Sequence, residues 1–226
     1  MYEATVAFGS GAARVVVPPP SSRLASRAAK RAFDWSVAAL LLIVLLPFFA
    51  LVAAMIALAG GPVLYGHPRI GRDGDTFHCL KFRTMFPDAE ARLQALLATD
   101  PRRAAEWAAH RKLDDDPRIT PVGRFLRATS LDELPQLINV LRGEMSIVGP
   151  RPVTADELLR YGLCARAYKS VRPGITGPWQ VSGRNDVGYR ERVRLDERYA
   201  REWRVTTDLL LVLRTPYAVL SQRGAK

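Results

Sequence analysis

Two adjacent carboxylates, Asp132 and Glu133, lie in the segment LRATSLDELPQLINVL, which spans residues 126–141. Such a pair can bind Mg²⁺ or supply a nucleophile that attacks phosphorus. The pair also fits a structural pattern, because Ser130 and Glu133 have the S-x-x-E spacing of a capping box and an apolar run follows. Carboxylates are favoured in a first helical turn, and Pro135 is tolerated there. Taken in isolation, this segment predicts a helix start better than a catalytic site.

The arginines that follow indicate chemistry on a phosphate. Arg151 lies between two prolines, in a rigid turn after a short apolar run. The segment RPGITGPWQVSGRND then contains Arg172, Trp179 and Arg184 among glycines. Glycines allow close approach of the backbone, arginines bind phosphate in a fork geometry, and tryptophan offers a stacking face. Each segment alone is typical of a Gly/Pro-rich loop, but together they predict a site for a diphosphate that carries a base.

Two carboxylates would repel a nucleotide diphosphate unless positive charge compensates for them. Mg²⁺ and arginine side chains can supply that charge, and a helix N-terminus adds backbone N–H donors. An aspartate can attack phosphorus and form an acyl phosphate, which divides one displacement into two steps. The sequence therefore predicts phosphoryl transfer with Mg²⁺ as the cofactor.

A β-hairpin is expected before the carboxylate pair. Two runs of strand-forming residues flank Arg72–Asp75, whose Asp-Gly pair is a strong turn signal. On the second run, Lys81 and Arg83 are two residues apart and are expected on one face. They form either a solvated strand face or a pair of cations directed at phosphate.

Three further segments have recognisable patterns. Residues 88–113 have the apolar spacing of a helix, which Pro101 divides into two. The acidic run Asp114–Asp116 is expected to form a turn and a helix cap rather than a metal site. The segment TTDLLLVLRTPYAVL is short for a membrane crossing and contains Arg214, so we expect it on the membrane or on the core.

No residue from Val37 to Ala59 is charged, and this run would extend about 34 Å as a helix, enough to cross a bilayer. Pro47 near its middle removes a backbone donor and costs about 3 kcal/mol in a regular helix. Positive charge flanks both ends of the run, so the positive-inside rule gives no orientation. Both a kinked span and a re-entrant hairpin agree with these features.

The overall charge is strongly basic, with 33 Lys and Arg against 22 Asp and Glu, a formal net charge of +11 and a pI of about 10.2. Such an excess favours a polyanionic partner: nucleic acid, anionic lipid or a phosphorylated small molecule. The first residues, up to about 28, are rich in small residues, Pro and Arg, and we expect a flexible leader there.

From Lys30 to about Leu220, the chain resembles the bacterial sugar transferase family, the monotopic polyprenyl-phosphate phosphoglycosyl transferases. The resemblance rests on four segments in the family's order: KRAFD, HPRIGRDGDTFHCLKFRTM, RATSLDELPQLINVLRGEMSIVGPRP and RPGITGPWQVSGRN. The variant is most similar to galactose-1-phosphate transferases that prime exopolysaccharide synthesis, including the segment EWAAHRKLDDDPRIT.

The resemblance implies transfer of a hexose-1-phosphate, with galactose favoured, from a UDP-sugar to undecaprenyl phosphate, with release of UMP. Asp132 would be the nucleophile that takes up the phosphosugar. Glu133 would help to hold Mg²⁺ and assist deprotonation of the acceptor. The residues expected to bind phosphate and nucleotide are Arg127, Arg151 and Arg172, together with Lys81, Arg83 and Arg184.

The fold implied is α+β and helix-rich. It comprises the leader over residues 1–28, a re-entrant helix-break-helix membrane element over 29–62 with the break at Pro47, and a cytosolic catalytic domain over 63–226. The catalytic domain would include the small hairpin and helices at the membrane interface, on the cytoplasmic face of the bacterial inner membrane. Many family members have Ser before the proline, whereas this chain has Leu46, so its bend must be stabilised in another way.

The expected partners are the UDP-sugar, undecaprenyl phosphate and the lipid bilayer. A homodimer is also compatible with the sequence. Two other functions compete with this one. A membrane-anchored basic protein could bind nucleic acid, but no nucleic-acid module is recognisable and the basic residues lie among turns, so no nucleic-acid partner is expected. A transferase that moves only the sugar would release UDP instead of UMP.

Overall fold

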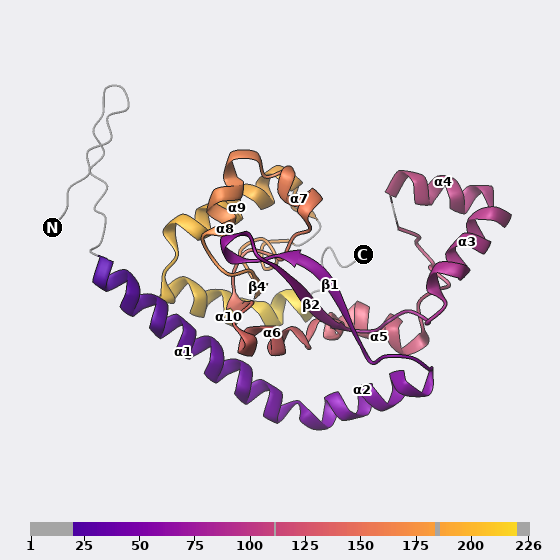
Figure 1. Cartoon of the computed structure of the whole chain (residues 1–226), viewed down its shortest axis with the longest axis horizontal. Helices are drawn as coiled ribbons and strands as arrows, with labels where there is room; N and C mark the ends of the chain where they lie inside the picture. The colour runs from indigo at the N-terminus through magenta and orange to yellow at the C-terminus, as the bar shows by residue number, and fades with distance from the viewer. Residues whose placement is uncertain (1–19, 111, 184–185, 221–226) are drawn as a thin grey trace.

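The computed structural model describes residues 20–110, 112–183 and 186–220. The helices, in chain order, are α1 (Pro20–Val44), α2 (Leu46–Leu58), α3 (Ala89–Thr99), α4 (Pro101–His110), α5 (Pro121–Thr129), α6 (Gln136–Arg142), α7 (Ala155–Leu159), α8 (Ala165–Lys169), α9 (Tyr189–Glu202) and α10 (Val205–Leu220). The strands are β1 (Leu64–Ile70), β2 (Thr76–Phe82), β3 (Ser146–Val148) and β4 (Gly174–Thr176). This order confirms a helix-rich α+β fold, in which α1 and α2 form a bent arm along one edge and α3 and α4 project from the body (Figure 1).

The arm bends by 63° between α1 and α2. Pro47 lies in the first turn of α2 and has no N–H to donate to the carbonyl of Ile43. The amides of Leu45 and Phe49 keep helical bonds of 2.9 Å to the carbonyls of Leu41 and Leu45. The predicted break at Pro47 is therefore confirmed as backbone geometry.

No described helix could span a membrane alone, but the bent pair Ser26–Val44 and Leu46–Leu58 together is long and apolar enough. Residues 20–28, assigned to the leader on sequence, form the first turns of α1. The rest of the expected leader, residues 1–19, lies outside the described residues.

Packing and capping hold α2 in place although Leu46 stands before the proline. Val52 and Ile56 are buried in a cluster with Phe82 and Leu126. The guanidinium of Arg83 donates to the carbonyl of Ile56 at 3.3 Å, at the C-terminal end of α2. Apolar burial and a cation at the negative end of the helix dipole both favour this position of α2.

The KRAFD segment anchors α1 to the body. Lys30 Nζ lies 2.6 Å from Asp208 Oδ2 in α10. Asp34, which is buried, accepts hydrogen bonds from Ser146 Oγ and from the amide of Ile147, both at 3.0 Å. These bonds tie the arm to β3, and β3 leads directly into the turn that contains Arg151.

The predicted hairpin is confirmed. Strands β1 and β2 pair antiparallel, from Leu64 opposite Phe82 to Ile70 opposite Thr76. In the connecting turn, Asp73 and Gly74 have φ values of 60° and 93°, a left-handed conformation that the Asp-Gly pair tolerates.

The main core lies between α1, β2, α6, α9, α10 and β3, which pairs in parallel with β4. In α10, Leu211 is buried against this core, while the outward side chains of Leu209, Leu213 and Tyr217 are 46%, 76% and 73% exposed. The apolar segment in α10 therefore packs on the core, which was one of the two positions expected for it from the sequence.

The expected helical region is divided as predicted, because α3 ends at Thr99 and α4 begins at Pro101. The acidic run forms a turn, in which Asp116 makes a bidentate pair with Arg118 at 2.7 and 2.8 Å. The prediction that it caps a helix is wrong. Thr120 caps α5 instead, since its hydroxyl accepts from the amide of Gly123 at 2.9 Å, and the carboxylate of Asp116 is engaged by the arginine.

We expect Gly123→Ala to destabilise the protein by about 1–3 kcal/mol, because a Cβ there would overlap the backbone carbonyl of Thr84, which cannot move aside cheaply. Gly188→Ala is the matched control, since it has φ −59° and no atom lies within 4 Å of its Cβ position. Thermal unfolding in detergent measures both variants. Equal midpoints would contradict close packing of α5 on residue 84.

Candidate active site

The carboxylate pair lies in a tight turn rather than at a helix start. The left-handed Ser130, with φ 58°, ends α5, and a 3₁₀ turn over Leu131–Glu133 follows. The next helix begins only at Gln136, after Pro135. The predicted capping box is therefore wrong, because the side chain of Ser130 makes no capping bond and Glu133 binds cations from other elements.

Glu133 is held by two cations. Its Oε1 accepts from Lys81 Nζ of β2 at 2.6 Å and from Arg151 Nη2, in the turn after β3, at 3.2 Å. Burial raises the pKa of this carboxyl, but the charges and hydrogen bonds of Arg151 and Lys81 outweigh burial and lower its pKa to about 2. Glu133 is therefore ionised throughout the physiological range.

For Asp132, burial outweighs the neighbouring positive charges and the pKa is raised rather than lowered. The residue is 9% exposed, and its Oδ2 lies 3.7 Å from Lys81 Nζ. Burial raises the pKa of this carboxyl, and the negative charge of Glu133 raises it further. The positive charges of Lys81, Arg127 and Arg151 oppose that rise. Neighbouring carboxyls whose pKa values are driven apart are suited to different roles in one reaction.

A small cleft opens beside Glu133, and Asp132 is not among its lining residues. Its lining comes from both strands of the hairpin, from the 3₁₀ turn η2 (Leu131–Glu133) and α6, and from the segments after β3 and at β4. The lining residues are Arg69, Cys79, Lys81, Glu133, Gln136, Arg151, Pro152, Gly174 and Ile175. Three cations and one carboxylate in this lining suit an anionic ligand.

Arg127 joins the site from α5. Its Nε donates to Thr84 Oγ1 at 2.8 Å, and the charge of Asp132 acts on the guanidinium. Burial lowers the pKa of Arg127, and Asp132 opposes that effect. The structure thus brings Lys81, Arg127 and Arg151 together around the two carboxylates.

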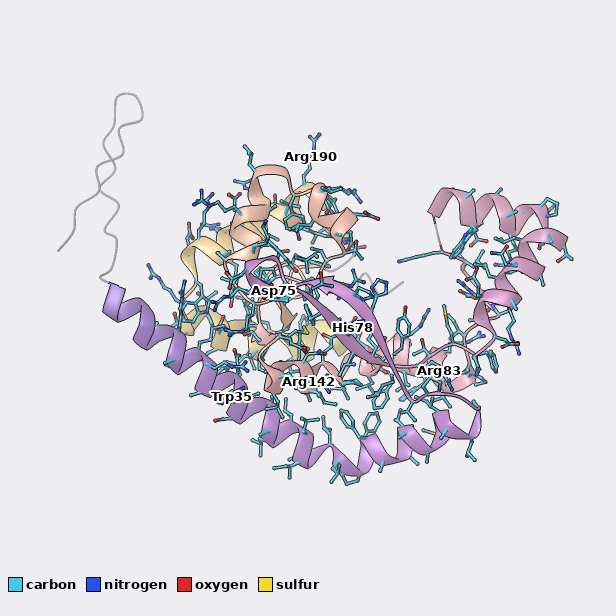
Figure 2. All side chains as sticks on the ribbon, in the orientation of Figure 1. Trp35, Asp75, His78, Arg83, Arg142 and Arg190 are labelled. Carbon is cyan, nitrogen blue, oxygen red and sulfur yellow. The ribbon has the colours of Figure 1, made fainter. Side chains whose placement is uncertain are left out.

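Arg83 and Arg172 are placed elsewhere. Strand β2 ends at Phe82, so the alternation that places Lys81 toward Glu133 does not extend to Arg83, which lies beside the end of α2 (Figure 2). Arg172 Nε donates to the carbonyl of Gly143 at 2.7 Å, beyond the last turn of α6. Arg184 lies outside the described residues.

Trp179 is enclosed rather than presented to a base. It is 7% exposed, and the guanidinium carbons of Arg151 and Arg192 lie 5.8 and 4.5 Å from its ring centroid. Cation–π attraction of this kind helps to orient Arg151 toward Glu133.

Sequence analysis missed Asp196 of α9. This carboxylate is fully buried, and its Oδ2 accepts from the hydroxyl of Tyr161 at 2.9 Å. Burial raises its pKa to about 7, although Tyr161, Trp179 and Arg151 oppose that rise. Its position three residues after Val193 and three before Tyr199, both buried, was the available signal.

The chain is similar to known proteins over most of its length. Residues 25–222 match the bacterial sugar transferase family. The exopolysaccharide production protein ExoY of Sinorhizobium fredii is 52% identical over 197 residues, covering 87% of each chain. The undecaprenyl-phosphate galactose phosphotransferase of Salmonella typhimurium is 48% identical over 204 residues, covering 90% of this chain and 43% of that protein.

A third relative, the UDP-glucose:undecaprenyl-phosphate glucose-1-phosphate transferase of Escherichia coli, is 38% identical over 209 residues, covering 88% of this chain and 42% of that protein. This chain thus spans less than half the length of the Salmonella and Escherichia proteins, but nearly the full length of the Sinorhizobium one. The family predicted from the sequence motifs is confirmed: the chain belongs to the bacterial sugar transferase family.

Proposed function

We propose that the protein is a phosphoglycosyl transferase that moves a hexose-1-phosphate from a UDP-sugar to undecaprenyl phosphate and releases UMP, as the first membrane step of exopolysaccharide synthesis. The observation that best supports this function is the buried Asp132 beside the ionised Glu133, with Lys81, Arg127 and Arg151 around them. The relatives' names provide independent support.

In the first step, a carboxylate oxygen of Asp132 attacks the phosphorus that bears the sugar. The bond from this phosphorus to the oxygen bridging the two phosphates breaks, and UMP leaves with that oxygen. Lys81 and Arg151 stabilise the negative charge on the phosphoryl oxygens, since both line the cleft. The product is an acyl phosphate that links Asp132 to the sugar phosphate.

In the second step, a phosphate oxygen of undecaprenyl phosphate attacks the same phosphorus and displaces Asp132 as a carboxylate. The lipid-linked diphosphate sugar forms, and the enzyme is regenerated. With a pKa of about 2, Glu133 is a weak base for the attacking phosphate, so its ionised carboxylate would act by charge and by orienting Lys81 and Arg151.

The donor set at this site suits Mg²⁺ shared with the substrate. Among the described residues no group of three or more His, Cys, Asp or Glu could hold a metal ion. Asp132 and Glu133 supply hard oxygen donors, and Mg²⁺ is commonly held by one or two carboxylates together with water and substrate phosphates. We therefore propose Glu133 as a ligand, and bound Mg²⁺ would neutralise charge on the diphosphate.

We further propose that the bent pair of helices enters one leaflet and returns, so that the catalytic domain lies on the cytoplasmic face of the inner membrane. The exposed apolar residues of the arm support this, among them Leu40, Ile43 and Leu46 at 61%, 71% and 65% exposure. Reporter tags at the two ends of the chain should then both be cytoplasmic in a labelling assay. A tag in the periplasm at one end would contradict re-entry.

The nucleotide released tests the reaction itself. Purified protein with Mg²⁺, undecaprenyl phosphate and a panel of UDP-sugars should release UMP, and we expect the fastest reaction with UDP-galactose, given the Salmonella relative. Release of UDP would identify a transferase that moves only the sugar. No turnover, together with salt-dependent DNA binding, would favour the nucleic-acid alternative.

A further inference from the structure

Helix α6 contains two buried amides one turn apart, and the fold uses only one of them. Asn139 is fully buried, and its Oδ1 accepts from the amide of Leu80 at 2.9 Å. Its Nδ2 donates to the carbonyl of His78 at 2.8 Å and to Glu144 Oε2 at 2.6 Å. The amide therefore joins α6 to the hairpin, which is a structural role.

Gln136 differs sharply from Asn139. It is only 3% exposed, and its side-chain amide has no hydrogen-bond partner among the described residues, but its polar atoms are not sealed from solvent, because the side chain lines the cleft. The fold therefore uses no hydrogen bond of this amide and leaves its NH₂ and carbonyl available to a ligand in the cleft.

The surroundings of this amide in the cleft indicate which kind of ligand it fits. Gln136 lines the cleft three residues beyond Glu133, together with Lys81, Arg151 and Arg69. Arg69 is paired with Glu157 at 2.9 Å, and Lys81 and Arg151 are both bound to Glu133. An amide NH₂ among cations complements phosphate oxygens, which accept hydrogen bonds but do not donate them when ionised.

We propose that Gln136 is a substrate-contacting residue whose side-chain NH₂ donates to a nonbridging oxygen of the phosphoryl group that is transferred to Asp132. This inference rests on the function proposed above. A contact to a sugar hydroxyl is the competing assignment, and it differs in a measurable way, because it would depend on the configuration of the sugar.

The test compares Gln136→Met with Asn139→Leu in the full chain. Methionine keeps the length of the side chain without its hydrogen bonds, so the unfolding midpoint of Gln136→Met should stay unchanged or rise. Its kcat/KM for UMP release should fall about 10- to 100-fold, equally for UDP-galactose and UDP-glucose. Asn139→Leu should instead lower the unfolding midpoint, because it leaves the backbone groups of His78 and Leu80 without partners.

Three results would overturn the proposal. The first is activity of Gln136→Met within about twofold of wild type. The second is a loss that differs more than about tenfold between the two sugars, which would assign the amide to a sugar hydroxyl. The third is an unfolding midpoint that drops as in Asn139→Leu while activity per folded molecule is kept, which would make Gln136 structural.

Calorimetric binding of UDP-galactose separates a failure of this proposal from a failure of the proposed function. A wild-type protein that binds UDP-galactose without releasing UMP would refute the function, while weaker binding by Gln136→Met would still support the contact. A wild-type protein that does not bind UDP-galactose would refute both.

Discussion

Asp132→Asn is expected to abolish turnover while the protein still folds. Loss of the attacking carboxylate should reduce UMP release by at least about 10³-fold, because an amide cannot form the acyl phosphate. The fold should tolerate the change. Burial raises the pKa of Asp132, which means that its ionised form destabilises the native state above the unfolded pKa, and asparagine removes that charge. The unfolding midpoint at pH 8 should therefore be unchanged or higher.

Mass spectrometry gives a second measurement on the same variant. Wild-type protein incubated with UDP-galactose but without undecaprenyl phosphate should gain the mass of a phosphohexose, and Asp132→Asn should not. Asp115→Asn is the matched control, since its carboxylate is 73% exposed in the acidic turn and pairs with Arg124 at 3.4 Å. Near-normal UMP release by Asp132→Asn would disprove the nucleophile role.

Lys81→Met is expected to reduce kcat/KM by about 10- to 100-fold and to shift the pH profile. The charge of Lys81 lowers the pKa of both Asp132 and Glu133. Its removal raises both pKa values, so protonation begins at higher pH and the acid limb of the profile moves to higher pH. The loss of activity should be largest on the acid side, where an unprotonated nucleophile becomes scarce.

Steady-state rates of UMP release from pH 5 to 9 measure this shift. Arg190→Met is the matched control, because it also removes one positive charge but from an exposed side chain that extends away from the body in Figure 2. An acid limb that stays where it is in wild type, together with unchanged kcat/KM, would show that Lys81 does not act on the carboxylate pair.

Local sequence signals predicted the elements whose geometry depends on neighbouring residues. Asp73 and Gly74 predicted the hairpin turn, Pro101 predicted the division between α3 and α4, and Pro47 predicted the bend. In each case a backbone constraint acts within a few residues: a left-handed φ, a fixed φ or a missing N–H donor. Such constraints can be recognised without knowing the fold.

Local sequence patterns gave wrong predictions where residues distant in the sequence bind the side chain in question. The S-x-x-E spacing predicted a cap at Ser130, but Lys81 and Arg151, from segments far away in sequence, bind the carboxylate of Glu133. Period-two alternation placed Arg83 with Lys81, but β2 ends between them and Arg83 caps α2.

By itself, the sequence determined the family, the carboxylate pair and a set of basic residues that includes the cations bound to the pair. Residue types and their order are sufficient for recognising such motifs. Only the tertiary structure decided which cations meet the pair, and why Asp132 and Glu133 differ. A pKa depends on burial and on charges within a few ångströms, and Lys81, Glu133 and Arg151 become neighbours only when β2, η2 and the turn after β3 pack together. The same packing distinguishes Gln136 from Asn139, two amides that look alike in the sequence until their hydrogen-bond partners are known.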